Sequence, residues 1–350
     1  MGAIDFSHGG NIYAVKEKYA KEVIDFSASI NPLGLPKGVR SVLSRAHESV
    51  IHYPDPEAKS LTSALAGYLN VSEENILAGN GSMELIYLIA QALNPMTTAI
   101  FAPTFSEYER AARCVNSKIS FIELNEKKLF VPDASCPERQ DLLFLCNPNN
   151  PTGNLILEDP SSIKRYKAGL IVVDESFMDF VDDEKKHTLL KQAARLQNII
   201  VLRTFTKFFA LAGLRIGYLV AHKEIIRKLK AYRIPWSVNV LSQEAGEAAL
   251  RDKDYIKRTR LIVGREREFL LKGLKAIGGL RPYPSVANFI LVKIEKDLLG
   301  AAELKEKLIR KGILIRDCAN FKGLSNKYFR VAVRLGAENL KLLAALRQVV

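Results

Sequence analysis

Lys207 ends the sequence Thr-Phe-Thr-Lys, and the residues around it could support the chemistry of an aldehyde cofactor. Its amine could form a Schiff base, and Thr204, Thr206 and Arg215 could bind a phosphate. Arg215 alone is equally compatible with a simple salt bridge. Asp174 ends an apolar run upstream and could keep a pyridine nitrogen protonated. These residue types, in this order, predict a site for pyridoxal 5'-phosphate.

The neighbours of Lys207 are unusually apolar for a lysine, a residue that is most often solvated at the surface. It follows a strand predicted at Ile199–Arg203 and is flanked by Phe205, Phe208 and Phe209. Loss of hydration in such surroundings lowers the pKa of an amine. We therefore expect the neutral amine that imine exchange requires.

The segment Gly79–Glu84 combines glycines with the start of a predicted helix. Free backbone N–H groups at a helix start favour an anion, and glycine lets the backbone approach it closely. The amides of Ser82 and Met83 could therefore bind the cofactor phosphate. The segment is also compatible with an ordinary turn that ends in a helix N-cap. The nearby pattern at Lys207 favours the phosphate.

Asn150 and Asp174 follow or end two predicted strands, Leu142–Cys146 and Leu170–Asp174. Open α/β sheets bind ligands at the carboxyl ends of their strands. Asn150 belongs to the sequence Asn-Pro-Asn-Asn-Pro-Thr-Gly, and its amide could reach both the phenolic oxygen of the cofactor and a substrate carboxylate. A proline-stiffened turn and a capping acid are the simpler interpretations of the two positions.

Short apolar runs alternate with helical patterns, which predicts an α/β fold with a mainly parallel, mixed sheet covered by helices. We expect an N-terminal substrate-site segment at 1–52 that joins the small domain, a large cofactor-binding domain at 53–232 and a small C-terminal α/β domain at 233–350. The predicted strands of the large domain are Thr98–Phe101, Ile119–Glu123, Leu142–Cys146, Leu170–Asp174, Ile199–Arg203 and Gly217–Val220. Its predicted helices are Ser82–Leu93, Glu107–Cys114 and Leu189–Leu196. The small domain has predicted strands at Asn288–Ile294, Ile313–Arg316 and Tyr328–Val333, followed by a helix to Val350.

Composition narrows the class of protein. With 350 residues, 48% of them hydrophobic, the chain can bury one large core and a smaller lobe. It contains no apolar run long enough to span a membrane and no signal-peptide pattern at its start, so we expect a cytoplasmic protein without a membrane partner. The four cysteines lack metal-binding spacing, which predicts reduced thiols and no metal at Cys114, Cys136, Cys146 and Cys318.

The net charge of +13 is compatible with nucleic acid, an anionic surface or an anionic substrate. Basic residues are densest at Lys223–Arg233 and Arg251–Arg267, where they alternate with apolar and acidic residues at helical spacing. That pattern is typical of solvated helix faces. Because no helix-turn-helix pattern is present, we do not expect a nucleic-acid partner. A cofactor-binding regulator or nucleic-acid binder is the least favoured interpretation.

The segments around Ser82, Asn150, Asp174 and Lys207 resemble the fold type I pyridoxal-phosphate enzymes, in the branch of the histidinol-phosphate aminotransferases. The resemblance covers nearly the whole chain. It implies that Lys207 is the Schiff-base lysine, that Asp174 pairs with the ring nitrogen and that Phe105 stacks on the ring. It also implies an obligate homodimer in which Tyr53 reaches the cofactor phosphate of the neighbouring subunit.

Three further segments are similar to the L-threonine-O-3-phosphate decarboxylases of cobalamin biosynthesis, namely His8–Asn11, Asp25–Gly34 and Ile315–Phe321. By this resemblance, His8, Gly9 and Arg316 bind the substrate phosphate and Arg330 binds the substrate carboxylate. The implied reaction is decarboxylation of L-threonine O-3-phosphate to (R)-1-amino-2-propanol O-2-phosphate. A histidinol-phosphate aminotransferase, or a related one, is the alternative.

Two positions depart from the family patterns. Ser29 stands where the decarboxylases usually have Asn, so this expected substrate contact has a shorter side chain. Phe177 stands where the aminotransferases usually have Tyr, so one hydrogen-bond donor to the phenolic oxygen of the cofactor is missing. The second departure favours decarboxylation over transamination.

Overall fold

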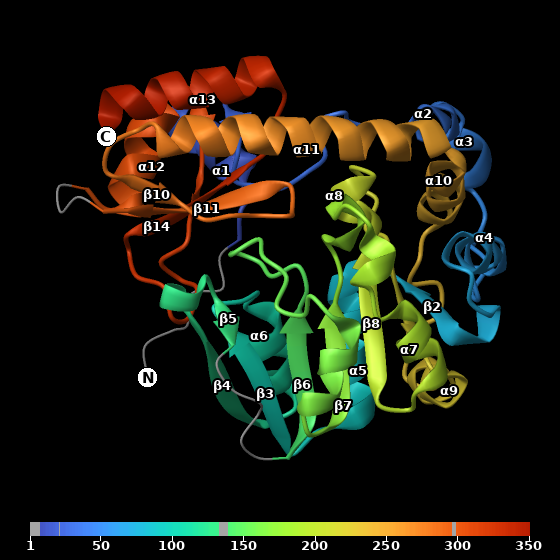
Figure 1. Cartoon of the computed structure of the whole chain (residues 1–350). Coiled ribbons are helices and arrows are strands. Elements are labelled where there is room, and N and C mark those ends of the chain that lie inside the picture. The colour runs from blue at the N-terminus through green and yellow to red at the C-terminus, as the bar shows by residue number, and fades with distance from the viewer. Residues whose placement is uncertain (1–7, 21, 133–138, 296–298) are drawn as a thin grey trace.

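The largest element of the computed structural model is an eight-stranded sheet with the order β2-β9-β8-β7-β6-β3-β4-β5 (Figure 1). The structure describes residues 8–20, 22–132, 139–295 and 299–350. The strands of this sheet are β2 (Ile76–Gly79), β3 (Thr97–Ala102), β4 (Lys118–Asn125), β5 (Val131–Pro132), β6 (Gln140–Cys146), β7 (Ala168–Asp174), β8 (Ile199–Thr204) and β9 (Gly217–Ala221).

Five neighbouring strands of this sheet, β8, β7, β6, β3 and β4, run parallel. β9 is antiparallel to both β8 and β2, and β5 is antiparallel to β4. The mainly parallel, mixed sheet and its six predicted strands are therefore confirmed. β2 and β5 were not predicted because strands of four and two residues are too short to show a periodic pattern.

The central strands each contain an uninterrupted apolar stretch, which is typical of a sheet that helices cover on both faces. Successive side chains of a strand point to opposite faces. On β6, Leu142 belongs to one buried cluster and Leu143 to the other, and on β7 Val172 and Val173 divide in the same way. Full burial of one such side chain contributes about 1.5 to 3 kcal/mol.

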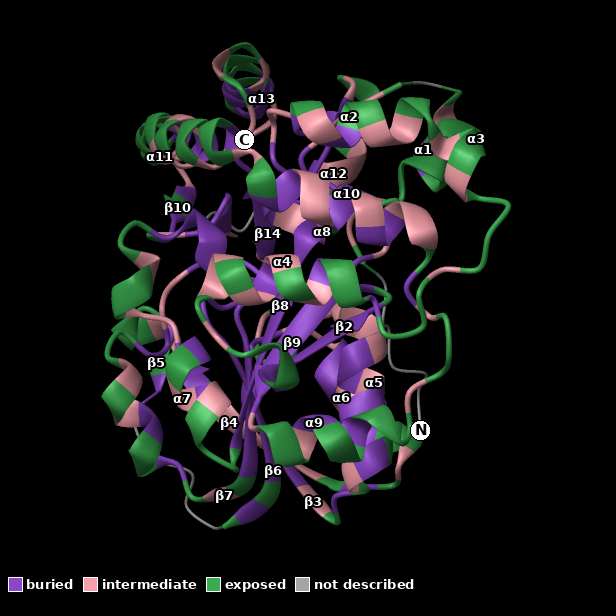
Figure 2. Cartoon of the chain, turned by 90° about the vertical axis from the view of Figure 1, so that its right-hand side faces the viewer, coloured by how far each residue is buried: buried purple, intermediate pink, exposed green. Residues whose placement is uncertain are grey.

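Helices α5, α6 and α9 pack on one face, and α4, α7 and α10 contribute to the cluster on the other. Their outer sides are exposed, as Figure 2 shows for α4 and α9 in front of the buried strands. The bounds are α4 (Lys59–Leu69), α5 (Gly81–Leu93), α6 (Glu107–Cys114), α7 (Leu190–Arg195), α9 (Lys223–Lys230) and α10 (Val240–Arg251). The three helices predicted in this region are confirmed, two of them with ends shifted by one residue.

The C-terminal part is built on an antiparallel sheet with the order β10-β11-β14-β13. Its strands are β10 (Leu280–Pro282), β11 (Phe289–Ile294), β13 (Arg316–Asp317) and β14 (Tyr328–Ala332). A separate parallel pair joins β1 (Ile24–Asp25) to β12 (Ile313–Leu314), which ties the N-terminal segment to this part. The domain boundaries at 52/53 and 232/233 stay predictions.

Helix α11 (Lys253–Lys275) begins beside α10 and α2 and runs across the top of the molecule toward the C-terminal sheet (Figure 1). It packs with α13 (Gly336–Val349), which in turn contacts α12 (Ala301–Arg310). The remaining α-helices are α1 (Ile12–Tyr19), α2 (Lys37–Ser44), α3 (Ala46–Ser49) and α8 (Phe205–Phe208).

None of the helices that the structure describes is both long and apolar enough to cross a membrane. The described residues contain no group of three or more His, Cys, Asp or Glu side chains that could hold a metal ion. Cys114, Cys146 and Cys318 are free thiols, and Cys136 lies outside the described residues.

Candidate active site

A cavity of about 250 Å³ lies between the carboxyl ends of β6, β7 and β8 and the strands β13 and β14. Segments far apart in the sequence meet there, as parallel strands that end at one edge of a sheet require. The predicted site residues that line it are His8, Gly9, Ser82, Met83, Phe105, Asn150, Asp174, Thr204, Thr206, Lys207, Arg215, Arg316 and Arg330.

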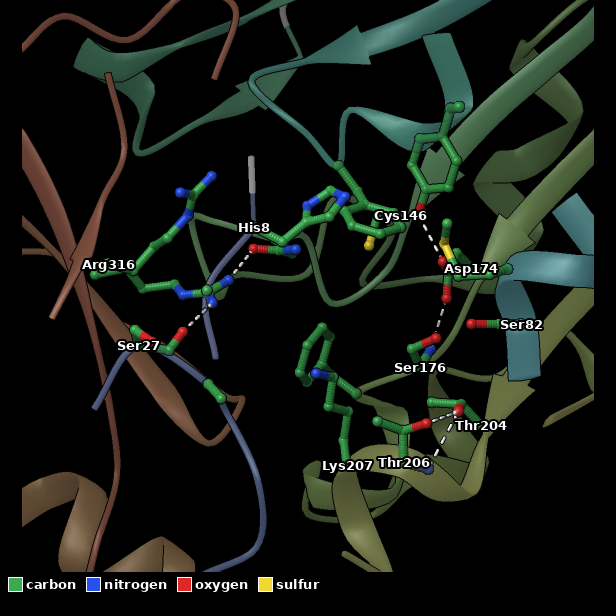
Figure 3. Close-up of a pocket in the computed structure, with 18 of the residues that line it drawn as sticks. His8, Ser27, Ser82, Cys146, Asp174, Ser176, Thr204, Thr206, Lys207 and Arg316 are labelled. Carbon is green, nitrogen blue, oxygen red and sulfur yellow. Dashed lines mark hydrogen bonds between the residues drawn. The ribbon is translucent and has the colours of Figure 1, made fainter. Parts of the chain in front are cut away.

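Lys207 lies in the short helix α8, directly after β8, and its side chain points up into the cavity (Figure 3). Loss of hydration lowers the pKa of the Lys207 amine to about 8, and the positive charges of Arg330 and Arg215 act in the same direction. This is the direction that its apolar flanks predict. A substantial fraction of the amine is therefore neutral near physiological pH.

Asp174 ends β7 and is buried on the other side of the cavity from Arg316 (Figure 3). Tyr108 Oη donates to Asp174 Oδ2 at 2.6 Å, and the backbone N–H of Ser176 donates to Asp174 Oδ1 at 2.9 Å. Burial raises the pKa of the Asp174 carboxyl, while these hydrogen bonds oppose the shift. A cation placed beside the carboxylate would offset the cost of burying its charge.

The start of α5 and the guanidinium of Arg215 are in close contact. Gly81 has a φ of 78°, and a Cβ there would stand 2.7 Å from Arg215 Nη2. A Cβ on Gly217 would stand 2.6 Å from the backbone nitrogen of Ser82. Both positions therefore require glycine. Backbone N–H groups at the start of a helix and an arginine are together the donor set that a phosphate prefers.

Two hydroxyls complete this corner of the cavity. Thr204 Oγ1 donates to Thr206 Oγ1 at 2.9 Å, and it also accepts the backbone N–H of Thr206 at 3.1 Å. Thr204 is the N-cap of α8, so the hydrogen bond that begins this helix also orients the hydroxyls toward the cavity. Figure 3 shows both side chains beside Ser82.

Two arginines occupy the opposite wall. Arg316 on β13 and Arg330 on β14 are partners in the strand register, so they stand side by side. Arg330 donates to Asn150 Oδ1 and, at 3.1 Å, to the carbonyl of Ser27, and burial lowers its pKa to about 10. Arg316 Nη2 donates to Asn320 Oδ1 at 2.7 Å. The two guanidiniums create a strongly positive wall that faces Lys207.

His8 enters the cavity from the segment before α1. Its ring packs near the ring of Phe105, with centroids 5.3 Å apart, and its Nε2 lies 2.7 Å from Glu107 Oε1. Gly9 packs against the backbone of Ser27, where a Cβ would collide with the Ser27 carbonyl. His8 therefore brings an imidazole to the same cavity as the two arginines (Figure 3).

Two predicted site residues, Ser29 and Tyr53, are not among the described residues that line the cavity. Ser29 is buried, and its hydroxyl has no hydrogen-bond partner among the described residues. Tyr53 is 84% exposed and packs beside Trp236, with ring centroids 5.2 Å apart. Neither residue therefore lines the cavity of its own chain, and the substrate contact of Ser29 and the cofactor contact of Tyr53 stay predictions.

The sequence pattern missed several residues that line the cavity, among them Ser27, Tyr108, Cys146, Ser176 and Phe321. A signal was available for Tyr108, because it lies three residues after Phe105, a spacing that places side chains on one face of a helical turn. The others are contributed by loops and strand ends whose positions no local pattern specifies.

A family model for class I and II aminotransferases matches residues 21–346. The chain belongs to this family. It is 36% identical to the threonine-phosphate decarboxylase of Salmonella typhimurium, over 100% of this chain and 98% of the relative. It is 37% identical to histidinol-phosphate aminotransferase 2 of Archaeoglobus fulgidus, over 94% of each chain. The crystal structure of L-threonine-O-3-phosphate decarboxylase from Porphyromonas gingivalis aligns with a TM-score of 0.83 and 29% identity, covering 93% of this chain and 98% of the other.

As a member of the class I and II aminotransferase family, the protein is an enzyme that uses pyridoxal 5'-phosphate. The residues of the cavity fit this cofactor. The partly neutral amine matches its aldehyde, and the buried carboxylate matches its ring nitrogen. Its phosphate is matched by a cradle of backbone amides, hydroxyls and Arg215. We assign these contacts to Lys207, Asp174 and the residues around Ser82 as proposals, together with stacking of Phe105 on the ring.

Proposed function

We propose that this enzyme decarboxylates L-threonine O-3-phosphate to (R)-1-amino-2-propanol O-2-phosphate, a building block of the cobalamin nucleotide loop. The paired arginines are the observation that carries the proposal. Arg316 and Arg330 are adjacent across two strands and face Lys207 in one cavity, apart from the Arg215 cradle. A small amino acid with both a carboxylate and a phosphate matches this second positive wall.

We assign the substrate carboxylate to Arg330 and its phosphate to Arg316, His8 and the backbone at Gly9. Arginine suits both anions because its planar fork can donate two parallel hydrogen bonds. Arg330 also donates to Asn150, which supports a carboxylate site next to the proposed cofactor contact of that amide. Two fixed anchors would hold the α-carbon in a single orientation, so that only one of its bonds is activated.

Decarboxylation breaks the bond between the α-carbon and the carboxylate, and carbon dioxide leaves. The cofactor, if held by Lys207 and Asp174, would supply an acceptor for the electron pair that remains on the α-carbon. Lys207 then returns a proton from Nζ to that carbon, which an amine with a pKa of about 8 can do near neutral pH.

Phe177 lines the same cavity and packs edge-on against Phe289, with ring centroids 4.9 Å apart. A phenyl ring supplies no hydrogen bond to the phenolic oxygen of the cofactor, where a tyrosine would. This difference supports decarboxylation over transamination, in which a different bond of the α-carbon breaks.

The deciding experiment is an assay for carbon dioxide released from L-threonine O-3-phosphate by the cofactor-loaded protein without any keto acid. We expect release together with aminopropanol phosphate. If the protein is inactive in this assay but transfers the amino group of histidinol phosphate to 2-oxoglutarate, the function is that of an aminotransferase. The 37% identical aminotransferase from Archaeoglobus fulgidus is the finding that favours this second candidate.

We also propose that the enzyme is a homodimer in which Tyr53 contacts the cofactor phosphate of the other subunit. An exposed apolar surface supports a second copy as the partner. It is formed by Ile51, Tyr53, Tyr232, Ile234 and Trp236, each at least half exposed. Such a concentration of large apolar side chains is typical of an interface. Tyr53 lies within this surface, as a residue shared between subunits requires.

A further inference from the structure

Glu107 is a buried carboxylate beside the cavity that the proposed reaction leaves without a role. It is the first residue of α6, and its side chain is fully buried. Its Oε1 contacts His8 Nε2 at 2.7 Å, and Tyr87 Oη donates to its Oε2 at 2.8 Å. Arg110 Nη1 lies 3.8 Å from Oε1. Both carboxylate oxygens are therefore engaged.

This carboxylate is held in its charged form. Burial alone would raise the pKa of Glu107, but the hydrogen bonds from His8 and Tyr87 and the charge of Arg110 bring it below the ordinary value. The start of a helix also favours a negative charge. Because a carboxylate only accepts hydrogen bonds, His8 must carry a proton on Nε2. Phosphate oxygens also accept, so the other ring nitrogen can bind them only when it carries a proton as well, in the imidazolium form.

Burial does not orient the His8 ring, because 43% of its side chain is exposed. The backbone beside it is anchored, since the N–H of Gly10 donates to Ser27 Oγ at 2.7 Å. Within the part of the chain that the structure describes, the polar contact of the ring is Glu107. The next residue of α6, Tyr108, donates to Asp174. The first turn of α6 thus contacts both His8, which we assign to the substrate phosphate, and Asp174, which we assign to the ring nitrogen of the cofactor.

We propose that Glu107, supported by Tyr87, is a positioning residue that aims His8 at the phosphoryl group of the substrate and so contributes to selectivity for phosphorylated amino acids. This inference rests on the proposed function, in which His8 binds the substrate phosphate. His8 then lies between two anions, and its removal leaves Glu107 as an uncompensated negative charge near the phosphate. Glu107 therefore helps phosphate binding only while His8 is present.

The test uses cofactor-loaded protein and two ligands that lack an amine and so cannot react, 3-phosphoglycerate and its unphosphorylated counterpart glycerate. Dissociation constants are measured by calorimetry for the wild type, Glu107→Gln, His8→Ala and the double variant. We expect Glu107→Gln to weaken 3-phosphoglycerate about tenfold, as loss of one charge-assisted contact would, and to leave glycerate unchanged. In the His8→Ala background the same substitution weakens 3-phosphoglycerate no further.

Two variants control for a loss of packing. Tyr87→Phe removes one donor to Glu107 but keeps the ring, and we expect a smaller weakening of 3-phosphoglycerate alone. Glu109→Gln changes a carboxylate that pairs with Arg113 on the same helix, and we expect no effect on either ligand. Glu107 is only structural if Glu107→Gln weakens both ligands equally, or if its effect is the same with and without His8.

The outcomes separate this inference from the proposed function. If His8→Ala weakens 3-phosphoglycerate but Glu107→Gln does not, the role of Glu107 is overturned and the phosphate site stands. If His8→Ala has no effect, the phosphate is bound elsewhere and both assignments are wrong. If no carbon dioxide is released but Glu107→Gln still weakens 3-phosphoglycerate only when His8 is present, the proposed reaction is wrong. Glu107 then remains a positioning residue.

Discussion

At the scale of single residues, the surroundings of Lys207 change the pKa of its amine and hence its reactivity. An ordinary lysine amine is charged until well above neutral pH. Partial burial and two nearby arginines lower the pKa of Lys207 to about 8, while Asp174 and Asp25 oppose the shift. Only the neutral amine attacks an aldehyde, so this shift supplies the reactive form under physiological conditions.

The pH dependence of cofactor uptake follows from this shift. We expect cofactor-free protein to take up pyridoxal 5'-phosphate at a rate that rises with pH, is half-maximal near the Lys207 pKa of about 8 and levels off about one pH unit higher. The rise comes from deprotonation of Lys207, whose lowered pKa means that the amine becomes neutral earlier than in free lysine. Stopped-flow absorbance of the lysine-bound cofactor measures the rate, with Nα-acetyl-lysine as reference. A rate that keeps rising to pH 10 contradicts the assignment, as does cofactor that is covalently attached to Lys207→Ala after borohydride reduction.

Gly81 provides a second test at this scale. An added methyl group would collide with Arg215 and would sit on a backbone with φ of 78°, so we expect Gly81→Ala to displace the guanidinium and weaken cofactor binding at least tenfold. Equilibrium dialysis against the cofactor measures the effect. Gly213→Ala is the matched control, because a methyl group there meets nothing within 4 Å. Equal cofactor affinities of Gly81→Ala and Gly213→Ala would show that the close approach of Gly81 to Arg215 does not contribute to cofactor binding.

At the scale of elements, a buried ion network joins the ends of the strands that carry the site. Arg203 on β8 is 1% exposed and pairs with Glu175, which follows β7, at 2.8 Å and with Asp179 at 3.1 Å. Glu175 is adjacent to Asp174, and Arg203 is adjacent to Thr204. The network therefore connects the segments that position the carboxylate and the lysine.

Removing the cation of this network should be severely destabilising. We expect Arg203→Met to lower the free energy of unfolding by roughly 3 to 5 kcal/mol, because two buried carboxylates lose their partner. Urea unfolding of the cofactor-free protein measures it. Arg195→Met, at an exposed position of α7, should change stability by less than about 0.5 kcal/mol. A loss below about 1 kcal/mol for Arg203→Met would show that water or other cations compensate.

At the scale of the whole molecule, Tyr53 and Trp236 belong to a group of large apolar side chains that are at least half exposed in the single chain. The proposed dimer would cover this surface and bring Tyr53 to the second cavity. Mixed dimers test the sharing of the site. We expect a dimer of one Lys207→Ala chain and one Tyr53→Phe chain to keep about half of the wild-type activity, because one of its two sites has both native residues.

The mixed dimer is prepared by co-expression of two differently tagged chains and is compared with the two parent dimers. If Tyr53 acted within its own chain, the only site with a lysine would lack its tyrosine hydroxyl. The mixed dimer would then be no more active than half of the Tyr53→Phe parent. Sedimentation of the wild type as a monomer would overturn the dimer itself.

The sequence alone determined those parts of the site that depend on local order. Asn150, Asp174 and Lys207 each follow or end a strand that the apolar pattern predicted correctly, and the carboxyl ends of parallel strands must meet at one edge of a sheet. The direction of the Lys207 pKa shift also followed from its neighbours, because three phenylalanines within two residues leave little room for water.

Only the tertiary structure decided which distant residues meet. His8 and Glu107 are 99 positions apart, and Arg316 and Arg330 stand together only because β13 and β14 pair in one register. Such contacts depend on the packing of whole elements, which local spacing does not encode. For the same reason the sequence could not decide whether Ser29 lines the cavity. It is buried and is not among the described residues of the lining, and its substrate contact stays a prediction.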